Sequence, residues 1–149
     1  MDYIYKQLTS VDAPLLKDLL KVFGEAFEDT ETYVDKIPSD SYLEALLAKP
    51  HFIAIVAMYQ GKVVGGLAAY LLEKFEQVRS EVDIYDLAVS TLHRRKGIAT
   101  GLIETLRVIA RDFGAYVIYV QADHGDTPAI KLYESLGKKE DVYHFDIEV

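Results

Sequence analysis

Two apolar runs and a further strand-like segment follow one another through the middle of the chain and constrain the fold more than any other feature. Phe52 to Tyr59 and Lys62 to Leu72 are strand-like, and Gln60-Gly61 between them is typical of a tight hairpin. Glu81 to Val89 predicts a third strand, after the charged loop Glu73 to Ser80. We therefore expect antiparallel strand pairs in the first part of the sheet.

The segments on either side of this centre alternate between strand-like and helical patterns. Thr9 and Asp12 have capping-box spacing, which predicts a helix start, and Gly24 weakens the end of that helix. Glu28 to Pro38 is acidic and irregular. The other expected strands are Tyr3 to Leu8, a buried strand Tyr116 to Val120, and Val142 to Val149. The other expected helices are Ser39 to Lys49, Arg95 to Phe113, and one that Thr127 caps, with Pro128 first and Gly137 as terminator.

This order of elements predicts the fold class. Antiparallel pairs come first and strand-helix-strand units follow, which favours an α/β chain of the α+β type with one mixed sheet between helices. The length of 149 residues fits a single domain, residues 1–149.

Composition excludes several classes of site. The chain has no cysteine, so disulfides, thiolate metal sites and a cysteine nucleophile are excluded, and we expect no metal. The net charge of −8 argues against a nucleic-acid partner. It reflects either solubility or the attraction of a cationic substrate. Without a signal-like start or a membrane-length apolar run, we expect a cytoplasmic protein with no membrane partner.

The strand Glu81 to Val89 has an unusual pattern. Val82 and Ile84 share one parity, whereas Leu87 and Val89 share the other. A bulge near Tyr85-Asp86 would bring all four side chains to one face, and bulges often lie beside active sites. The alternative is a strand that is buried on both faces, where parity carries no information.

A short basic segment containing two small residues follows this strand, at the expected start of a helix. The segment is Arg94-Arg95-Lys96-Gly97-Ile98-Ala99. No Ser, Asp or Asn stands at the obvious cap position, so the first helical amides are available to an anion such as pyrophosphate. The pattern is neither a Walker A loop nor a Rossmann fingerprint. Taken alone, these six residues favour the simpler interpretation, a basic turn that merely starts a helix.

Two spaced motifs resemble the GCN5-related N-acetyltransferases. Arg-x-x-Gly-x-Ala at Arg94 to Ala99 is similar to their acyl-CoA-binding motif. Ala129-x-x-Leu132-Tyr133-x-x-Leu136-Gly137 is similar to their second motif, with its helical tyrosine. The resemblance implies that family's fold, a sheet of six to seven strands flanked by about four helices, and acetyl-CoA as cosubstrate.

A narrower resemblance covers nearly the whole chain and is weakest from Lys17 to Asp40. The matching segments resemble the type I aminoglycoside 3-N-acetyltransferases, the gentamicin-modifying enzymes. Those segments are Ala68 to Tyr70, Lys74 to Gln77, Tyr85 to Val89, His93 to Arg95, Gly97 to Thr100, Gly114 to Asp123 and His144 to Ile147. The resemblance implies direct acetylation of an aminoglycoside, at its 3-amino group, and antibiotic resistance. Asp83 and His124 depart from the family pattern, so no role is carried over to them.

The resemblance and the chemistry of acetyl transfer together suggest catalytic residues. Asp86 is the first candidate for the base that accepts a proton from the ammonium group; Asp83 is the second and Glu81 the third. The alternative for each is a solvated strand carboxylate. The Leu87 N–H is the expected donor to the carbonyl oxygen as negative charge develops there. Tyr133 is expected to donate a proton to the departing thiolate, or else to be a core residue of its helix.

Binding residues are expected in two groups. The acetyl-CoA site is expected to consist of Leu87, Ala88, Val89, Arg94, Arg95, Lys96, Gly97, Ile98, Ala99, Thr100 and Tyr133. Carboxylates should bind the ammonium groups of the substrate, and the candidates are Asp86, Asp123, Asp126, Glu28, Asp29 and Asp146, with Glu76 a weaker one. His124 is interpreted as an exposed loop histidine.

Two alternatives for the function remain open. The same fold could acetylate a polyamine, another small amine or a protein lysine, all of which suit an acidic chain. The chain could also be a non-catalytic acyl-CoA sensor, although Asp86 and Tyr133 argue against loss of turnover. A homodimer is compatible with the family, but the sequence carries no interface signature.

Overall fold

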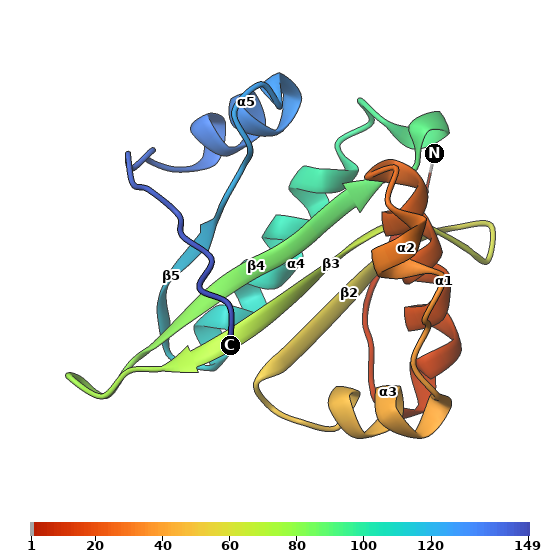
Figure 1. The fold of residues 1–149 in the computed structure, drawn as a ribbon, viewed down its shortest axis with the longest axis horizontal. Coiled ribbons are helices and arrows are strands. Elements are labelled where there is room, and N and C mark those ends of the chain that lie inside the picture. Colours follow the sequence, from red (N-terminus) through yellow and green to blue (C-terminus); the bar gives the residue numbers. More distant parts are fainter. Residues whose placement is uncertain (1) are drawn as a thin grey trace. The chain divides into compact units, whose positions relative to one another are not determined.

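The computed structural model describes residues 2–149, which form two compact parts that divide after Tyr119. The first contains β1 (Ile4–Gln7), a 3₁₀ turn (Ser10–Asp12), α1 (Ala13–Ala26), α2 (Thr30–Tyr33), α3 (Asp40–Leu47), β2 (Phe52–Tyr59), β3 (Lys62–Glu73), β4 (Ser80–Val89), a second 3₁₀ turn (Thr91–His93), α4 (Ile98–Asp112) and most of β5 (Ala115–Val120) (Figure 1). The second contains α5 (Thr127–Leu136).

The five strands form one sheet in the order β1-β2-β3-β4-β5. The first four strands are antiparallel to their neighbours. Helix α4 connects β4 to β5, and a helical crossover returns the chain in the same direction, which makes the sheet mixed. The expected α+β architecture is confirmed.

The sheet has five strands rather than six to seven, because the segment Val142 to Val149 is not a strand. Its sequence alternates in a strand-like way, but a strand also needs a neighbour that completes its hydrogen bonds. Tyr143, Phe145 and Ile147 remain exposed. The alternating pattern indicates only a preference for extended backbone. It does not show whether a partner strand is available.

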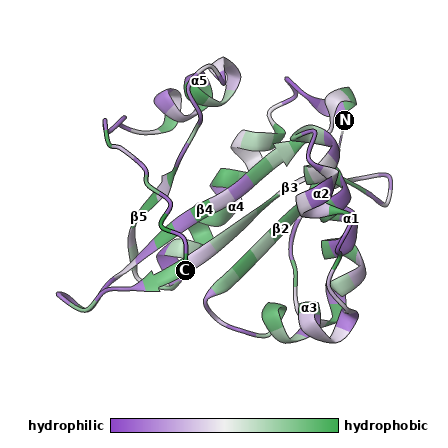
Figure 2. Cartoon of the chain, viewed as in Figure 1, coloured by the Kyte–Doolittle hydropathy of each residue, from purple (hydrophilic) through white to green (hydrophobic). Residues whose placement is uncertain are grey.

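Helices cover both faces of the sheet in the first part of the chain. Helices α1 and α3 cover one face and α4 covers the other (Figure 1). Strand β2 is apolar along its length (Figure 2), and Ile53 to Ala57 is buried on both sides. Helix α1 approaches β3 so closely that a Cβ added at Gly66 would lie 2.5 Å from Leu19 Cδ1. This rigid core supports the strand that carries the candidate site.

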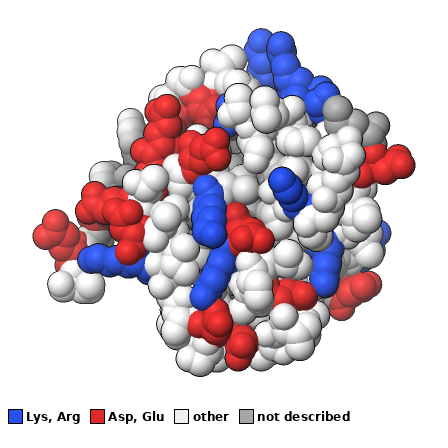
Figure 3. All heavy atoms as spheres, turned by 90° about the vertical axis from the view of Figure 1, so that its right-hand side faces the viewer, with Lys and Arg blue, Asp and Glu red and all other residues white. Residues whose placement is uncertain are grey.

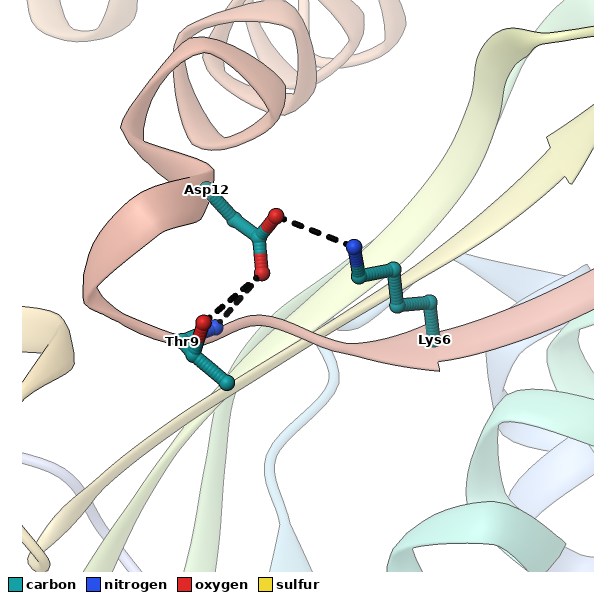
Figure 4. Close-up of polar contacts among 3 residues, drawn as sticks. All are labelled: Lys6, Thr9 and Asp12. Atoms are coloured by element: carbon teal, nitrogen blue, oxygen red, sulfur yellow. Dashed lines mark hydrogen bonds and ion pairs between the residues drawn. The ribbon is translucent and has the colours of Figure 1, made fainter.

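The corner between β1 and α1 confirms the predicted cap (Figure 4). The Asp12 carboxylate accepts from the Thr9 N–H at 2.8 Å and from the Thr9 hydroxyl at 3.2 Å. The Lys6 ammonium lies 3.0 Å from the other oxygen. These contacts, led by the Thr9 N–H bond, lower the pKa of Asp12. The 3₁₀ turn comes first, and α1 follows from Ala13.

The structure corrects two expectations about where helices lie. The helix expected from Arg95 starts at Ile98, because Arg95 and Gly97 have φ angles of 61° and 80°, outside the helical region. The segment Glu28 to Pro38, expected to be irregular, contains the short helix α2. Asp29 caps α2 by accepting from the Thr32 N–H at 3.1 Å.

The end of the chain gives two further corrections. Asp126, rather than Thr127, caps α5 by accepting from the Ala129 N–H at 3.4 Å, whereas Gly137 ends that helix as expected. Strand β5 lies at the sheet edge and is not buried, since Tyr116, Val117 and Tyr119 are exposed. None of the helices within residues 2–149 is long and apolar enough to cross a membrane.

Candidate active site

A β-bulge in β4 organises the candidate site. Ile84 is opposite Ala69 and Asp86 is opposite Ala68, so Tyr85 is an extra residue without a partner on β3. The bulge that the parity change suggested is therefore confirmed. Side chains along a strand alternate between the two faces of the sheet. The extra residue therefore brings Asp86 to the same face as Asp83, which is opposite Tyr70 on β3.

The Asp86 carboxylate is half-buried and lies under a tyrosine from a distant segment. The Tyr33 hydroxyl, at the end of α2, is 3.0 Å from both Oδ1 and Oδ2 of Asp86. Burial raises the pKa of Asp86, and the hydrogen bond from Tyr33 opposes that rise. Burial and the charge of Asp86 in turn raise the pKa of Tyr33 far above neutrality, so the phenol remains a donor.

Tyr33 was not among the residues predicted from the sequence. It is 53 positions from Asp86 and lies in the segment where the family resemblance is weakest. Its ring packs against Phe23 and Phe27, with centroid distances of 5.8 and 5.5 Å. Nothing in the local sequence indicated that this aromatic cluster would extend to a carboxylate.

The other two candidate bases have different surroundings. Burial raises the pKa of Asp83. Glu81, at the opposite end of β4, accepts from the Tyr116 hydroxyl and lies 3.3 Å from the Lys74 ammonium. The Tyr116 bond first, and then Lys74, lower the pKa of Glu81. All three carboxylates lie on one face of β4, but Glu81 is already paired, whereas Asp83 and Asp86 lie near the Tyr70 ring, which is 6.0 Å from the Tyr85 ring.

The basic segment after β4 forms a turn with an open helix start. The Arg94 Nε donates to the Val89 carbonyl at 3.0 Å, and His93 Nδ1 lies 3.0 Å from the Tyr3 hydroxyl, so both residues anchor the turn. No side chain caps α4 at Gly97, and a Cβ built there would have no atom within 4 Å. The first amides of α4 therefore have no side-chain cap.

The residues of this turn fit a phosphate-bearing ligand. The amides of Ile98, Ala99 and Thr100 are the first three of the helix, whose dipole favours an anion. Arg95 and Lys96 are exposed beside them. Leu87, Ala88 and Val89 form the end of the strand that leads into the turn.

The second part of the chain holds the remaining candidates on or near α5. Burial of Tyr133, and then the charge of Asp126, raise the pKa of its phenol. Asp123 and His124 are exposed in the connection before α5. Asp126 acts as the helix cap, and Asp146 lies 2.9 Å from the His144 ring.

The carboxylates expected to bind ammonium groups in the first part have local partners or are exposed. Asp29 caps α2, and Glu28 beside it is exposed, with a φ of 51°. Glu76 lies 3.6 Å from both Lys74 and Arg79. On the face shown in Figure 3, acidic and basic side chains are interspersed rather than separated. Within residues 2–149, no group of three or more metal-ligating side chains is placed to hold a metal ion.

Comparison with known proteins gives matches over the whole chain. An aminoglycoside acetyltransferase from an uncultured soil metagenomic sample is 52% identical, with a TM-score of 0.98 over 100% of this chain and 99% of that one. A second soil metagenomic aminoglycoside acetyltransferase, solved in complex with sisomicin, is 32% identical, with a TM-score of 0.91 over 99% of this chain and 96% of that one.

Curated relatives match over a shorter range. N-acetyltransferase family 8 member 2 from Rattus norvegicus is 31% identical over 105 residues, which are 70% of this chain and 44% of the relative. The chain thus spans less than half the length of that relative. The sequence model of the acetyltransferase (GNAT) family matches residues 16–138. With the bulged strand and the open helix start in place, we conclude that this chain belongs to the acetyltransferase (GNAT) family.

Proposed function

We propose that this chain transfers the acetyl group of acetyl-CoA directly to the 3-amino group of an aminoglycoside antibiotic, and so confers resistance. The observation that carries the choice of acceptor is full-length similarity to two aminoglycoside acetyltransferases, at 52% and 32% identity. The half-buried Asp86 carboxylate beside the bulge supports the chemistry, because a base must lie in reach of an ammonium group.

Acetyl-CoA would bind along the end of β4 and at the start of α4. The pyrophosphate would be held by the first amides of the helix and by basic side chains at Arg94, Arg95 and Lys96. The pantetheine arm would pair with Ala88 and Val89 as an added strand. When bound, acetyl-CoA supplies a thioester carbonyl as the electrophile.

The chain's own residues would then manage two protons and one developing charge. Asp86 accepts the proton that the ammonium group loses, directly or through a water, which frees the amine for attack. The Leu87 N–H donates to the carbonyl oxygen as it becomes negative. As the new N–C bond forms and the C–S bond breaks, the nitrogen releases its second proton to solvent, and the Tyr133 hydroxyl gives a proton to the thiolate and later regains one from solvent. The raised pKa of Tyr133 keeps this phenol protonated at neutral pH.

The acceptor's other ammonium groups would be held by carboxylates. Asp83 shares the face of Asp86, and the exposed Asp123, Glu28 and Asp146 are further candidates. Asp29 and Asp126 each use one carboxylate oxygen as a helix cap, which leaves the second oxygen for an ammonium group.

The decisive test is to incubate the purified chain with acetyl-CoA and sisomicin, with spermidine and a lysine peptide in parallel. We expect one added acetyl group on sisomicin by mass spectrometry, located at the 3-amino group by NMR. We also expect a rise in the inhibitory concentration of sisomicin for a susceptible bacterial host that expresses the chain. Acetylation of spermidine or the peptide with none of sisomicin would refute the proposed acceptor.

A further inference from the structure

The segment between α1 and α3 holds the Tyr33 hydroxyl against the Asp86 carboxylate. This segment carries α2, which ends at Tyr33, and its backbone is closed by hydrogen bonds from Val34 N–H and Asp35 N–H to Thr30 O, both 2.8 Å long. Asp29 N–H donates to Gly24 O at 2.9 Å and ties the segment to the end of α1.

Gly24 allows this segment to lie very close to α1. A Cβ added at Gly24 would be 2.7 Å from Val34 Cγ2 and 3.6 Å from Tyr33 Cβ. On the ring side, Phe23 and Phe27 pack against Tyr33. The phenol is therefore fixed by backbone closure, by close packing and by aromatic contact, and its hydroxyl is presented to Asp86.

The contact with Asp86 leaves the carboxylate able to act. One hydroxyl proton is shared by the two oxygens at 3.0 Å, so a single donor satisfies only a small part of their accepting capacity. Among the described residues 2–149, Asp86 forms no ion pair of the kind that joins Glu81 to Lys74. A carboxylate held in this way keeps one orientation and still has free lone pairs for the substrate's proton.

The other titratable groups around this pair are acids and phenols. Asp83 and Tyr85 lie on β4, Tyr70 lies opposite on β3, and Tyr42 of α3 and Asp29 before α2 complete the surroundings. Each of these is neutral or negative at neutral pH, so none of them favours ionisation of Asp86. The Tyr33 hydroxyl is the group that opposes the effect of burial on that carboxylate.

We propose that Tyr33 is a positioning residue for acetyl transfer, which fixes the orientation of the Asp86 carboxylate and stabilises its charged form by donating a hydrogen bond to it. This inference rests on the proposed role of Asp86 as the base. It adds the α1–α3 connection, for which no catalytic role was predicted, to the machinery of the site.

The test is Tyr33→Phe, which keeps the aromatic packing and removes only the hydroxyl. We expect the acid limb of kcat/KM for sisomicin to move to higher pH by about 1 unit, the order expected for losing one hydrogen bond to a charged group. In a ¹³C NMR titration, assigned with Asp86→Asn, the pKa of the Asp86 carboxyl should rise by the same amount. This second readout requires no turnover.

The matched control is Tyr116→Phe, which removes a tyrosine–carboxylate bond at the other end of the same strand. It should leave the acid limb in place. An unchanged Asp86 pKa in Tyr33→Phe would overturn the inference while leaving the proposed function intact. Full turnover in Asp86→Asn would instead overturn the proposed base, and the two failures are thereby distinguished.

Discussion

The two ends of β4 each hold a carboxylate bonded to a tyrosine hydroxyl, yet the two carboxylates have opposite character. At the start of the strand, Glu81 has the Tyr116 hydroxyl and the Lys74 ammonium as partners, and its pKa is lowered. Beside the bulge, Asp86 has Tyr33 and a half-buried position, and its pKa is raised.

The difference shows that the effect of a tyrosine hydroxyl depends on how deeply its carboxylate is buried. The Tyr33 hydroxyl opposes the effect of burial on the pKa of Asp86 without reversing it, whereas at Glu81 the Tyr116 bond outweighs burial and the Lys74 ammonium lowers the pKa further. An ion-paired carboxylate is a weak proton acceptor and a good structural contact. A half-buried carboxylate with one neutral donor retains the basicity that proton transfer needs.

The largest expected effect separates the two carboxylates by function. Asp86→Asn should lower the turnover of sisomicin by about 10²–10⁴-fold, the usual contribution of a general base, and should change acetyl-CoA affinity much less. Glu81→Gln should retain turnover. Steady-state kinetics across pH, with acetyl-CoA binding by calorimetry, would check both. Equal losses in the two variants would contradict the comparison.

A second prediction concerns the phenol assigned to the thiolate. Tyr133→Phe should slow acetyl transfer by about 10–100-fold, the low end of the contribution of a general acid, and should leave the fold intact. Single-turnover kinetics measure the rate, and circular dichroism checks the fold. Tyr116→Phe serves again as the matched loss of a hydroxyl. Wild-type rates in Tyr133→Phe would refute the role of Tyr133.

The third prediction concerns stability, where the two carboxylates should have opposite signs. The raised pKa of Asp86 means that its ionisation opposes folding above that pKa, so Asp86→Asn should raise the Tm at pH 7, by about 1–3 °C after allowance for solvent screening. This gain should vanish as the pH falls below the ordinary value for aspartate, where both states are protonated.

Glu81 should behave in the reverse way. Its lowered pKa stabilises the fold at pH values above the ordinary glutamate value, and that contribution is lost as the pH falls through the lowered pKa. Glu81→Gln should therefore lower the Tm at pH 7. Thermal unfolding of both variants from pH 3 to pH 7 tests the pair, and shifts of the same sign at neutral pH would count against it.

The smallest expected effect comes from leaving Glu81, like Asp86, with a tyrosine hydroxyl and no cation beside it. Lys74→Met removes the cation and keeps the Tyr116 bond, so the pKa of Glu81 should rise by less than about 1 unit, as befits an exposed pair. Turnover should not change. A ¹³C NMR titration of the Glu81 carboxyl measures the shift, and a lowered turnover would show that this end of the strand takes part in the reaction.

Much of this arrangement could be predicted from sequence because it depends on local pattern. The change of parity between Ile84 and Leu87 indicated the bulge, and the Thr9–Asp12 spacing indicated the first helix. The start of α4 was misplaced by three residues, since side-chain pattern does not report that Arg95 has a positive φ.

What could not be predicted depends on contacts between distant segments. The Tyr33–Asp86 bond joins positions 53 residues apart through a connection that has no strong pattern of its own. The expected final strand, Val142 to Val149, failed for a related reason. Alternation describes a segment's own preference, whereas a strand also depends on a partner elsewhere in the chain.

The bulge at Tyr85 limits which changes related sequences can tolerate in β4. One extra residue decides which side of the sheet Asp86 faces, so the chemistry depends on a count of residues as well as on their identity. Most replacements at Tyr85 would preserve that count, whereas a one-residue insertion or deletion between Glu81 and Ile84 would shift the strand against its neighbour. Comparisons among related sequences should therefore show a fixed spacing around this position.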